Sequence, residues 1–169
     1  MTVMPPGWRK VALTAHVTTS VGWLGAVAVF LALAVTGLTS DDPQTVRGVY
    51  VAAKVTTWLV IVPLNLTALL TGLVQSLGTT WGLFRHYWVL IKLLLTVVAT
   101  VLLLLHTQPI GSVADAALSG PVAGDDLRDL RVQLVGDAVA ALLLLLTTTA
   151  LSVWKPRGLT RYGQRSRQA

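Results

Sequence analysis

Residues 87–106 read YWVLIKLLLTVVATVLLLLH, and Lys92 is the only residue of this stretch with a full charge at neutral pH. About 20 predominantly apolar residues are enough for an α-helix to cross the hydrocarbon core of a bilayer. Unpaired backbone groups are too costly in lipid, so a segment of this kind has to be helical. The stretch therefore predicts a transmembrane helix.

Three other stretches of the chain have the same apolar character. Together with the first, the predicted helices cover about residues 11–38, 49–75, 87–106 and 132–154. Helices of this length leave only short loops and tails in a chain of 169 residues. We therefore expect one membrane domain, 1–169, with an all-α fold: an integral membrane four-helix bundle in the cell (plasma) membrane.

The composition excludes several classes of protein. Hydrophobic residues make up 54% of the chain and charged residues 12%, whereas soluble domains have about 25% charged residues. This argues against a soluble enzyme and against a disordered protein. The sequence has no cysteine and no glutamate, so disulfides, thiolate metal sites and glutamate-containing metal motifs are also excluded.

The basic residues predict how the bundle is oriented. Lysine and arginine concentrate in cytoplasmic flanks of membrane helices. The flanks on the side of the two termini contain Arg9, Lys10, Arg85, Lys155, Arg157, Arg161, Arg165 and Arg167. Both termini are therefore predicted to be cytoplasmic, with the C-terminal tail against anionic lipid headgroups. Topology thus explains the net charge of +6, and no nucleic acid is expected as a partner.

Three local signals refine the helix boundaries. Ser40–Pro43 combines an N-cap with a proline, which predicts that the second helix extends outward over Asp42–Val46. The acidic run from Asp125 predicts an early start of the fourth helix, because acids suit the positive end of the helix dipole. Pro63 should kink the second helix and free carbonyls near residues 59 and 60.

Three titratable residues fall in the outer half of the predicted bundle: Lys54, His106 and Asp137. A charge inside a membrane is costly and usually faces the bundle interior, where it is paired. We expect Lys54 and Asp137 to form an intramembrane ion pair that neutralises both.

The inner half contains His16, Lys92 and His86. His16 is either a hydrogen-bonded histidine, a haem or metal ligand, or a proton carrier. Lys92 has no acid at its depth, so it either snorkels to the cytoplasmic surface or meets an external anion. An anionic cofactor such as haem would offer iron to His16 and propionates to Lys92, with His86 or neutral Lys92 as second iron ligand.

The first helix reads HVTTSVGWLG over His16–Gly25. This pattern resembles the opening helix of the copper-resistance CopD family and of the HemJ-type protoporphyrinogen oxidases. It also resembles a family of uncharacterised four-helix bacterial integral membrane proteins. The resemblance implies a b-type haem on His16, or a copper-related role. Further similarity to the uncharacterised family lies in Thr71-Gly72-Leu73, Trp88, Lys92 and His106.

Three functions remain open from the sequence. The first is a haem-binding or redox membrane protein with His16 as an axial ligand. The second is a small transport protein whose conduit is lined by Lys54, Asn65, Lys92 and Asp137. The third is a non-catalytic accessory subunit, and the sequence does not decide whether the protein is an enzyme. A homo-oligomer and a partner membrane subunit both fit.

Overall fold

The computed structural model describes residues 4–78, 86–119, 125–154, 158 and 160. This part of the chain is helical and contains no strand, so the predicted all-α class is confirmed. The elements are α1 (Pro6–Thr39), α2 (Pro43–Thr56), the π-helical turn η1 (Thr57–Ile61), α3 (Val62–Gly78), α4 (Tyr87–Ser119) and α5 (Asp125–Trp154).

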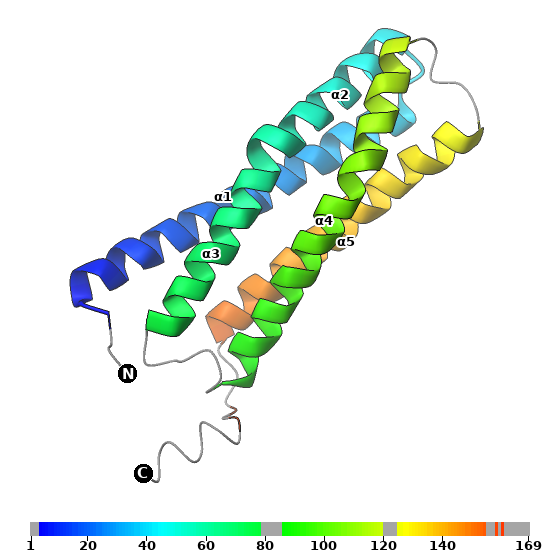
Figure 1. Ribbon diagram of the computed structural model, residues 1–169. Helices are drawn as coiled ribbons and strands as arrows, with labels where there is room; N and C mark the ends of the chain where they lie inside the picture. The colour runs from blue at the N-terminus through cyan, green and yellow to red at the C-terminus, as the bar shows by residue number, and fades with distance from the viewer. Residues whose placement is uncertain (1–3, 79–85, 120–124, 155–157, 159, 161–169) are drawn as a thin grey trace.

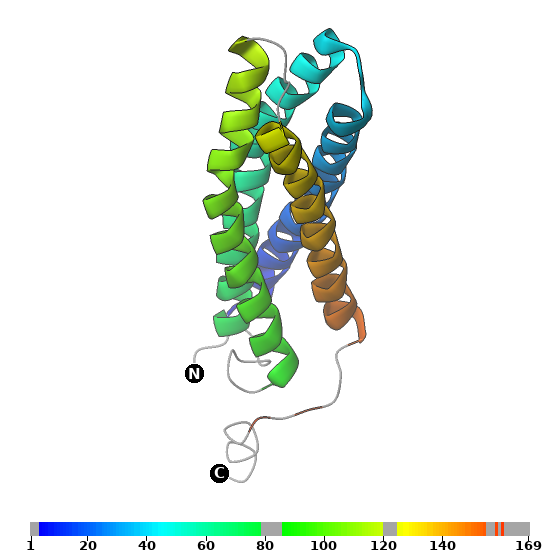
Figure 2. The same ribbon diagram turned by 90° about the vertical axis from the view of Figure 1, so that its right-hand side faces the viewer.

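The elements α2, η1 and α3 follow one another without a break, so the described residues form four long helices. Each of the four is long and apolar enough to cross a membrane. Figure 1 shows them side by side, and Figure 2 shows that α1 and α5 cross the other two at an angle. The first turn of α1 and the last turn of α5 lie at the same end of the bundle.

The packing leaves apolar side chains on the outside of the bundle. Helix α1 packs against α2, α3 and α5, and α4 packs against the same three elements. Large side chains nevertheless point outward, among them Leu59, Leu94 and Leu105, which are 71%, 64% and 65% exposed. Water would penalise such a surface at about 25 cal/mol per Å², whereas lipid would not.

Both predicted helix starts are confirmed. Helix α2 begins at Pro43, and the carboxylate of Asp42 caps it by accepting hydrogen bonds from the N–H groups of Gln44 and Thr45. The hydroxyl of Thr45 also donates to this carboxylate, and these bonds hold the pKa of Asp42 below its ordinary value. Helix α5 begins at Asp125.

The irregularity predicted before Pro63 takes the form of the π-helical turn η1. Proline has no N–H group, and its ring clashes with the carbonyl four residues earlier in a regular α-helix. Here the chain widens by one residue instead, and the N–H of Val62 bonds to the carbonyl of Thr57. Turns of this kind are frequent at functional sites.

Helix α4 differs from the prediction, which ended this helix at His106. The structure continues it through Pro109 to Ser119. Proline is tolerated within membrane helices because neighbouring groups can satisfy the freed carbonyl. As a result Asp115, which was expected in a loop, lies on the helix.

Three helices are joined at one end of the bundle by Gly37 of α1, Tyr50 of α2 and Arg131 of α5. Arg131 donates to the carbonyl of Gly37 and, over 3.1 Å, to the hydroxyl of Tyr50. Its guanidinium also lies over the Tyr50 ring, 5.8 Å from the centroid. A Cβ on Gly37 would come within 2.6 Å of this ring, so only glycine permits the contact.

Candidate functional site

The predicted ion pair between Lys54 and Asp137 is wrong, because each residue has a different partner. Lys54 Nζ lies 2.7 Å from Asp115 Oδ1. The cause is the length of α4: its continuation carries Asp115 about 14 Å further along the axis than His106, to the level of Lys54. Both side chains of this pair are more than a third exposed.

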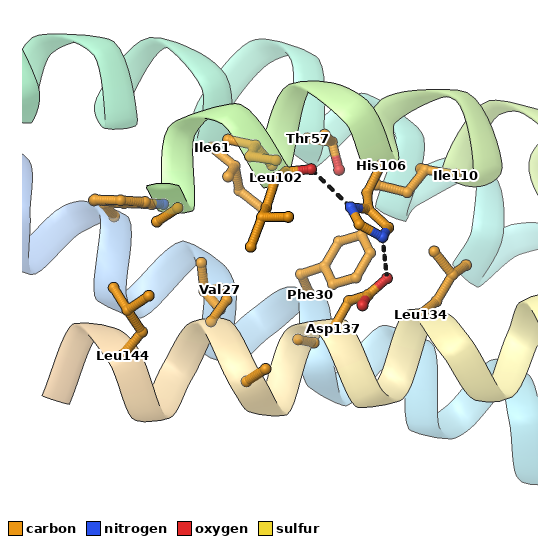
Figure 3. A pocket seen from close by; sticks show the side chains of 16 residues that line it. Val27, Phe30, Thr57, Ile61, Leu102, His106, Ile110, Leu134, Asp137 and Leu144 are labelled. Atoms are coloured by element: carbon orange, nitrogen blue, oxygen red, sulfur yellow. Dashed lines mark hydrogen bonds and ion pairs between the residues drawn. The ribbon is translucent and has the colours of Figure 1, made fainter. Parts of the chain in front are cut away.

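Asp137 instead faces His106 across the bundle, from α5 to α4 (Figure 3). His106 Nε2 lies 3.3 Å from Asp137 Oδ2. On the other side of the imidazole ring, Nδ1 is 2.7 Å from the carbonyl oxygen of Leu102. A carbonyl can only accept a hydrogen bond, so Nδ1 must hold a proton and donate it.

The geometry has a place for one proton between Nε2 of His106 and Oδ2 of Asp137. If His106 were neutral, its proton would be on Nδ1, and Nε2 would present a lone pair to the carboxylate. Oδ2 of Asp137 is buried, and no hydrogen-bond donor reaches it in the described part of the chain. A proton between Nε2 and Oδ2 removes the repulsion and converts the contact into an ion pair.

The pair lines a pocket of about 230 Å³. Its walls come from α1, η1, α4 and α5, and the π-helical turn contributes two of the lining residues. Among the sixteen residues that line the pocket, only His106 and Asp137 are titratable. The sixteen are Trp23, Val27, Phe30, Thr57, Ile61, Ala99, Leu102, Leu103, His106, Ile110, Leu134, Asp137, Ala138, Ala140, Ala141 and Leu144.

Further polar contacts follow α4 from the pocket toward its N-terminal end. Asn65 is fully buried, and its Oδ1 lies 2.9 Å from the hydroxyl of Thr100. Its Nδ2 is buried with no hydrogen-bond partner among the described residues. Nearer the end of the bundle, Lys92 donates to the hydroxyl of Ser152 over 2.5 Å. Lys92 is therefore held by α5, inside the bundle.

His16 is a hydrogen-bonded histidine between α1 and α3. Its Nδ1 lies 3.1 Å from both the Ala68 carbonyl and the Thr71 hydroxyl, and the carbonyl requires a proton on Nδ1. The ring lies against Gly72, where a Cβ would come within 3.1 Å of Cε1.

The predicted haem donors do not line the pocket that contains His106 and Asp137. His16, Lys92 and His86 are absent from the pocket lining. The ring of His86 lies near that of Trp88 at the start of α4, with centroids 6.3 Å apart. Within the described residues, no three His, Cys, Asp or Glu side chains are grouped closely enough to hold a metal ion. We therefore derive no chemistry through haem.

Some predicted positions lie outside the described residues. They are Arg85 and the C-terminal Lys155, Arg157, Arg161, Arg165 and Arg167.

The sequence did contain a signal for Asp115 that the prediction missed. Ile110, Val113, Ala114 and Ala117 are all buried. Their spacing of i, i+3, i+4 and i+7 is the pattern of a helix that continues with one face against the core. The partner of Asp137 had no comparable signal, because His106 and Lys54 were both assigned to the same half of the bundle.

Comparison of the chain with protein-family models, with curated proteins and with solved structures finds no match. The functional argument therefore rests on the geometry of the described residues.

Proposed function

We propose that the chain is a multi-pass protein of the cell membrane, with cytoplasmic termini, and that it is a small transport protein that moves protons. The His106–Asp137 pair is the proton-binding group. The observation that supports this is the hydrogen bond from Nδ1 to Leu102, combined with the 3.3 Å contact between Nε2 and Oδ2.

The surroundings of the pair support a transport role over a purely structural one. A structural ion pair is normally packed on all sides, whereas this pair lines a pocket. Intramembrane titratable groups mark proton relays and ion pathways in many membrane proteins. The buried Asn65 and Thr100 and the half-buried Lys92 extend from the pocket toward the opposite end of α4.

Reconstituted vesicles test the proposal. The purified protein is placed in liposomes that contain a trapped pH-sensitive dye, and a potassium diffusion potential drives protons inward. We expect the wild-type protein to acidify the interior faster than protein-free liposomes do. Asp137→Asn and His106→Phe should each reduce the rate to that of protein-free liposomes, since neither variant can form the protonated pair.

Asp129→Asn is the matched control, because Asp129 is an exposed carboxylate on the same helix and is not part of the pocket. It should acidify the vesicles at the wild-type rate. Circular dichroism verifies that each variant is helical. An Asp137→Asn variant that conducts protons as well as the wild type would contradict the proposal. A folded wild-type protein that gives no proton flux would contradict it as well.

A further inference from the structure

The His106–Asp137 pocket has features of a ligand site as well as of a proton site. We infer that it binds a small hydrophobic ammonium cation, which replaces the proton on the pair. This inference rests on the proposed function, because the exchanged proton is the one assigned there to the pair. The evidence for the cation itself is the lining of the pocket.

Besides the imidazole of His106 and the hydroxyl of Thr57, the lining combines one carboxylate with two aromatic rings, and the remaining wall is apolar. Trp23 and Phe30 of α1 line the pocket and are 5% and 6% exposed. Figure 3 shows the ring of Phe30 beside the contact between His106 and Asp137. A cation near an aromatic ring is attracted by the negative face of the ring, most strongly where water is excluded.

The size of the pocket limits the ligand. Its volume of about 230 Å³ lies below the range of about 300–1,000 Å³ for sites of drug-sized ligands. Most of the wall consists of alanine, valine, leucine and isoleucine side chains, so the body of the ligand has to be apolar. A quaternary ammonium group with one small aromatic or aliphatic substituent meets both conditions.

The charge balance of the site makes binding an exchange. With one proton on the pair, His106 is an imidazolium and Asp137 a carboxylate, so the site is neutral. When a monovalent cation binds to the carboxylate, a second positive charge in the apolar pocket is unfavourable. His106 therefore releases its Nε2 proton to water, and the site stays neutral with one cation bound and one proton lost.

Benzyltrimethylammonium is a suitable probe because its charge does not depend on pH. Neopentylbenzene, in which carbon replaces the nitrogen, is its neutral isostere. Binding of each to the detergent-purified full chain is measured by titration calorimetry. We expect the cation to bind wild type at least tenfold more tightly than the isostere does. Its apparent Kd should rise about tenfold for each unit of decrease in pH over the range in which the pair takes up its proton.

The variants separate the carboxylate from the rest of the pocket. Asp137→Asn should weaken binding of the cation at least tenfold and leave the affinity for the neutral isostere unchanged. Unchanged binding of the isostere also shows that the pocket is intact. Phe30→Leu should weaken binding of the cation about fivefold, because the cation–π contact is lost. Asp129→Asn should alter neither ligand.

Equal affinity of wild type for the two ligands, or an Asp137→Asn variant that keeps the cation, would overturn the inference. If Asp137→Asn does not fold, the wild type decides the matter: a cation affinity that is independent of pH contradicts the exchange. Binding is measured without a membrane gradient, so its failure is distinct from loss of proton flux in vesicles.

Discussion

Asp137 shows how well the position and the partner of a single charged residue can be predicted from the sequence of this chain. Depth along the predicted helices put Lys54, His106 and Asp137 in one half of the bundle. The choice of partner depends on two further quantities, the angle around each helix and the true helix end. Neither follows from hydropathy, because the apolar run ends at His106 whereas α4 continues to Ser119. The need for a partner was therefore predictable, and its identity was not.

At the same scale, the close contact of Gly37 with Tyr50 predicts that a substitution at Gly37 lowers the stability of the protein. Gly37→Ala places a methyl group 2.6 Å from Cζ of Tyr50, and Tyr50 is 1% exposed and has no room to move. Overpacking of this kind costs about 1–3 kcal/mol. We expect a lower thermal midpoint for the variant in detergent, as measured by circular dichroism.

Gly25→Ala is the control for this prediction, since it makes the same change in the same helix. A Cβ at Gly25 meets nothing within 4 Å. Alanine has the higher helix propensity, by up to about 1 kcal/mol, so this variant should be as stable as the wild type or more so. A Gly37→Ala variant that melts together with Gly25→Ala would show that the close contact with Tyr50 is unimportant.

At the scale of elements, helix starts were predictable and helix continuity was not. Asp42 and Asp125 mark the starts of α2 and α5, because capping and helix-dipole preferences are local properties of the chain. The two prolines behave differently from each other. Pro63 is preceded by a π-helical turn, whereas α4 continues through Pro109. Which response occurs depends on the packing of neighbouring helices, which no local pattern contains.

Pro63→Ala tests the role of the π-helical turn. Alanine restores the N–H group and allows a regular α-helix, which would rotate Lys54 relative to Asn65 by about 100°. Lys54 would then turn away from Asp115. The chain has no cysteine, so the double variant Lys54→Cys with Asp115→Cys can be cross-linked with a short thiol reagent. We expect efficient cross-linking when residue 63 is proline and little cross-linking in the Pro63→Ala background.

The matched pair is Asn65→Cys with Thr100→Cys, which replaces two side chains 2.9 Å apart on α3 and α4. Asn65 lies beyond the π-helical turn and Thr100 lies on the separate helix α4. This cross-link should therefore form equally well with proline or alanine at residue 63. Equal cross-linking of the Lys54 and Asp115 positions in both backgrounds would show that the turn does not set the position of α2.

At the scale of the whole molecule, the surface and the order of the helices both have the character expected of the predicted four-helix bundle. Apolar side chains point outward along all four long helices. The first turn of α1 and the last turn of α5 lie at one end of the bundle. This arrangement follows from four successive antiparallel helices, and it was predictable because span length and loop length are set by composition alone.

The proposed orientation predicts which cysteines can be labelled from outside the cell. A single Asp41→Cys variant should react with a membrane-impermeant maleimide in intact cells. A single Gly7→Cys variant should react only after the membrane is permeabilised. Asp41 and Gly7 are both exposed at opposite ends of α1, so local burial does not explain a difference. The reverse labelling pattern would contradict cytoplasmic termini.

The hydrogen bond from His106 to Leu102 sets the stoichiometry of the site. Since Nδ1 keeps its proton, only Nε2 can exchange one, and each bound cation releases a single proton. Exchange of one cation for one proton moves no net charge, so the membrane potential, which drives protons in the vesicles without the cation, does not drive the exchange. The pH gradient is the whole driving force and supplies about 1.4 kcal/mol per unit. Coupled across a membrane, a one-for-one exchange of this kind would concentrate a monovalent cation about tenfold for each pH unit, and no further.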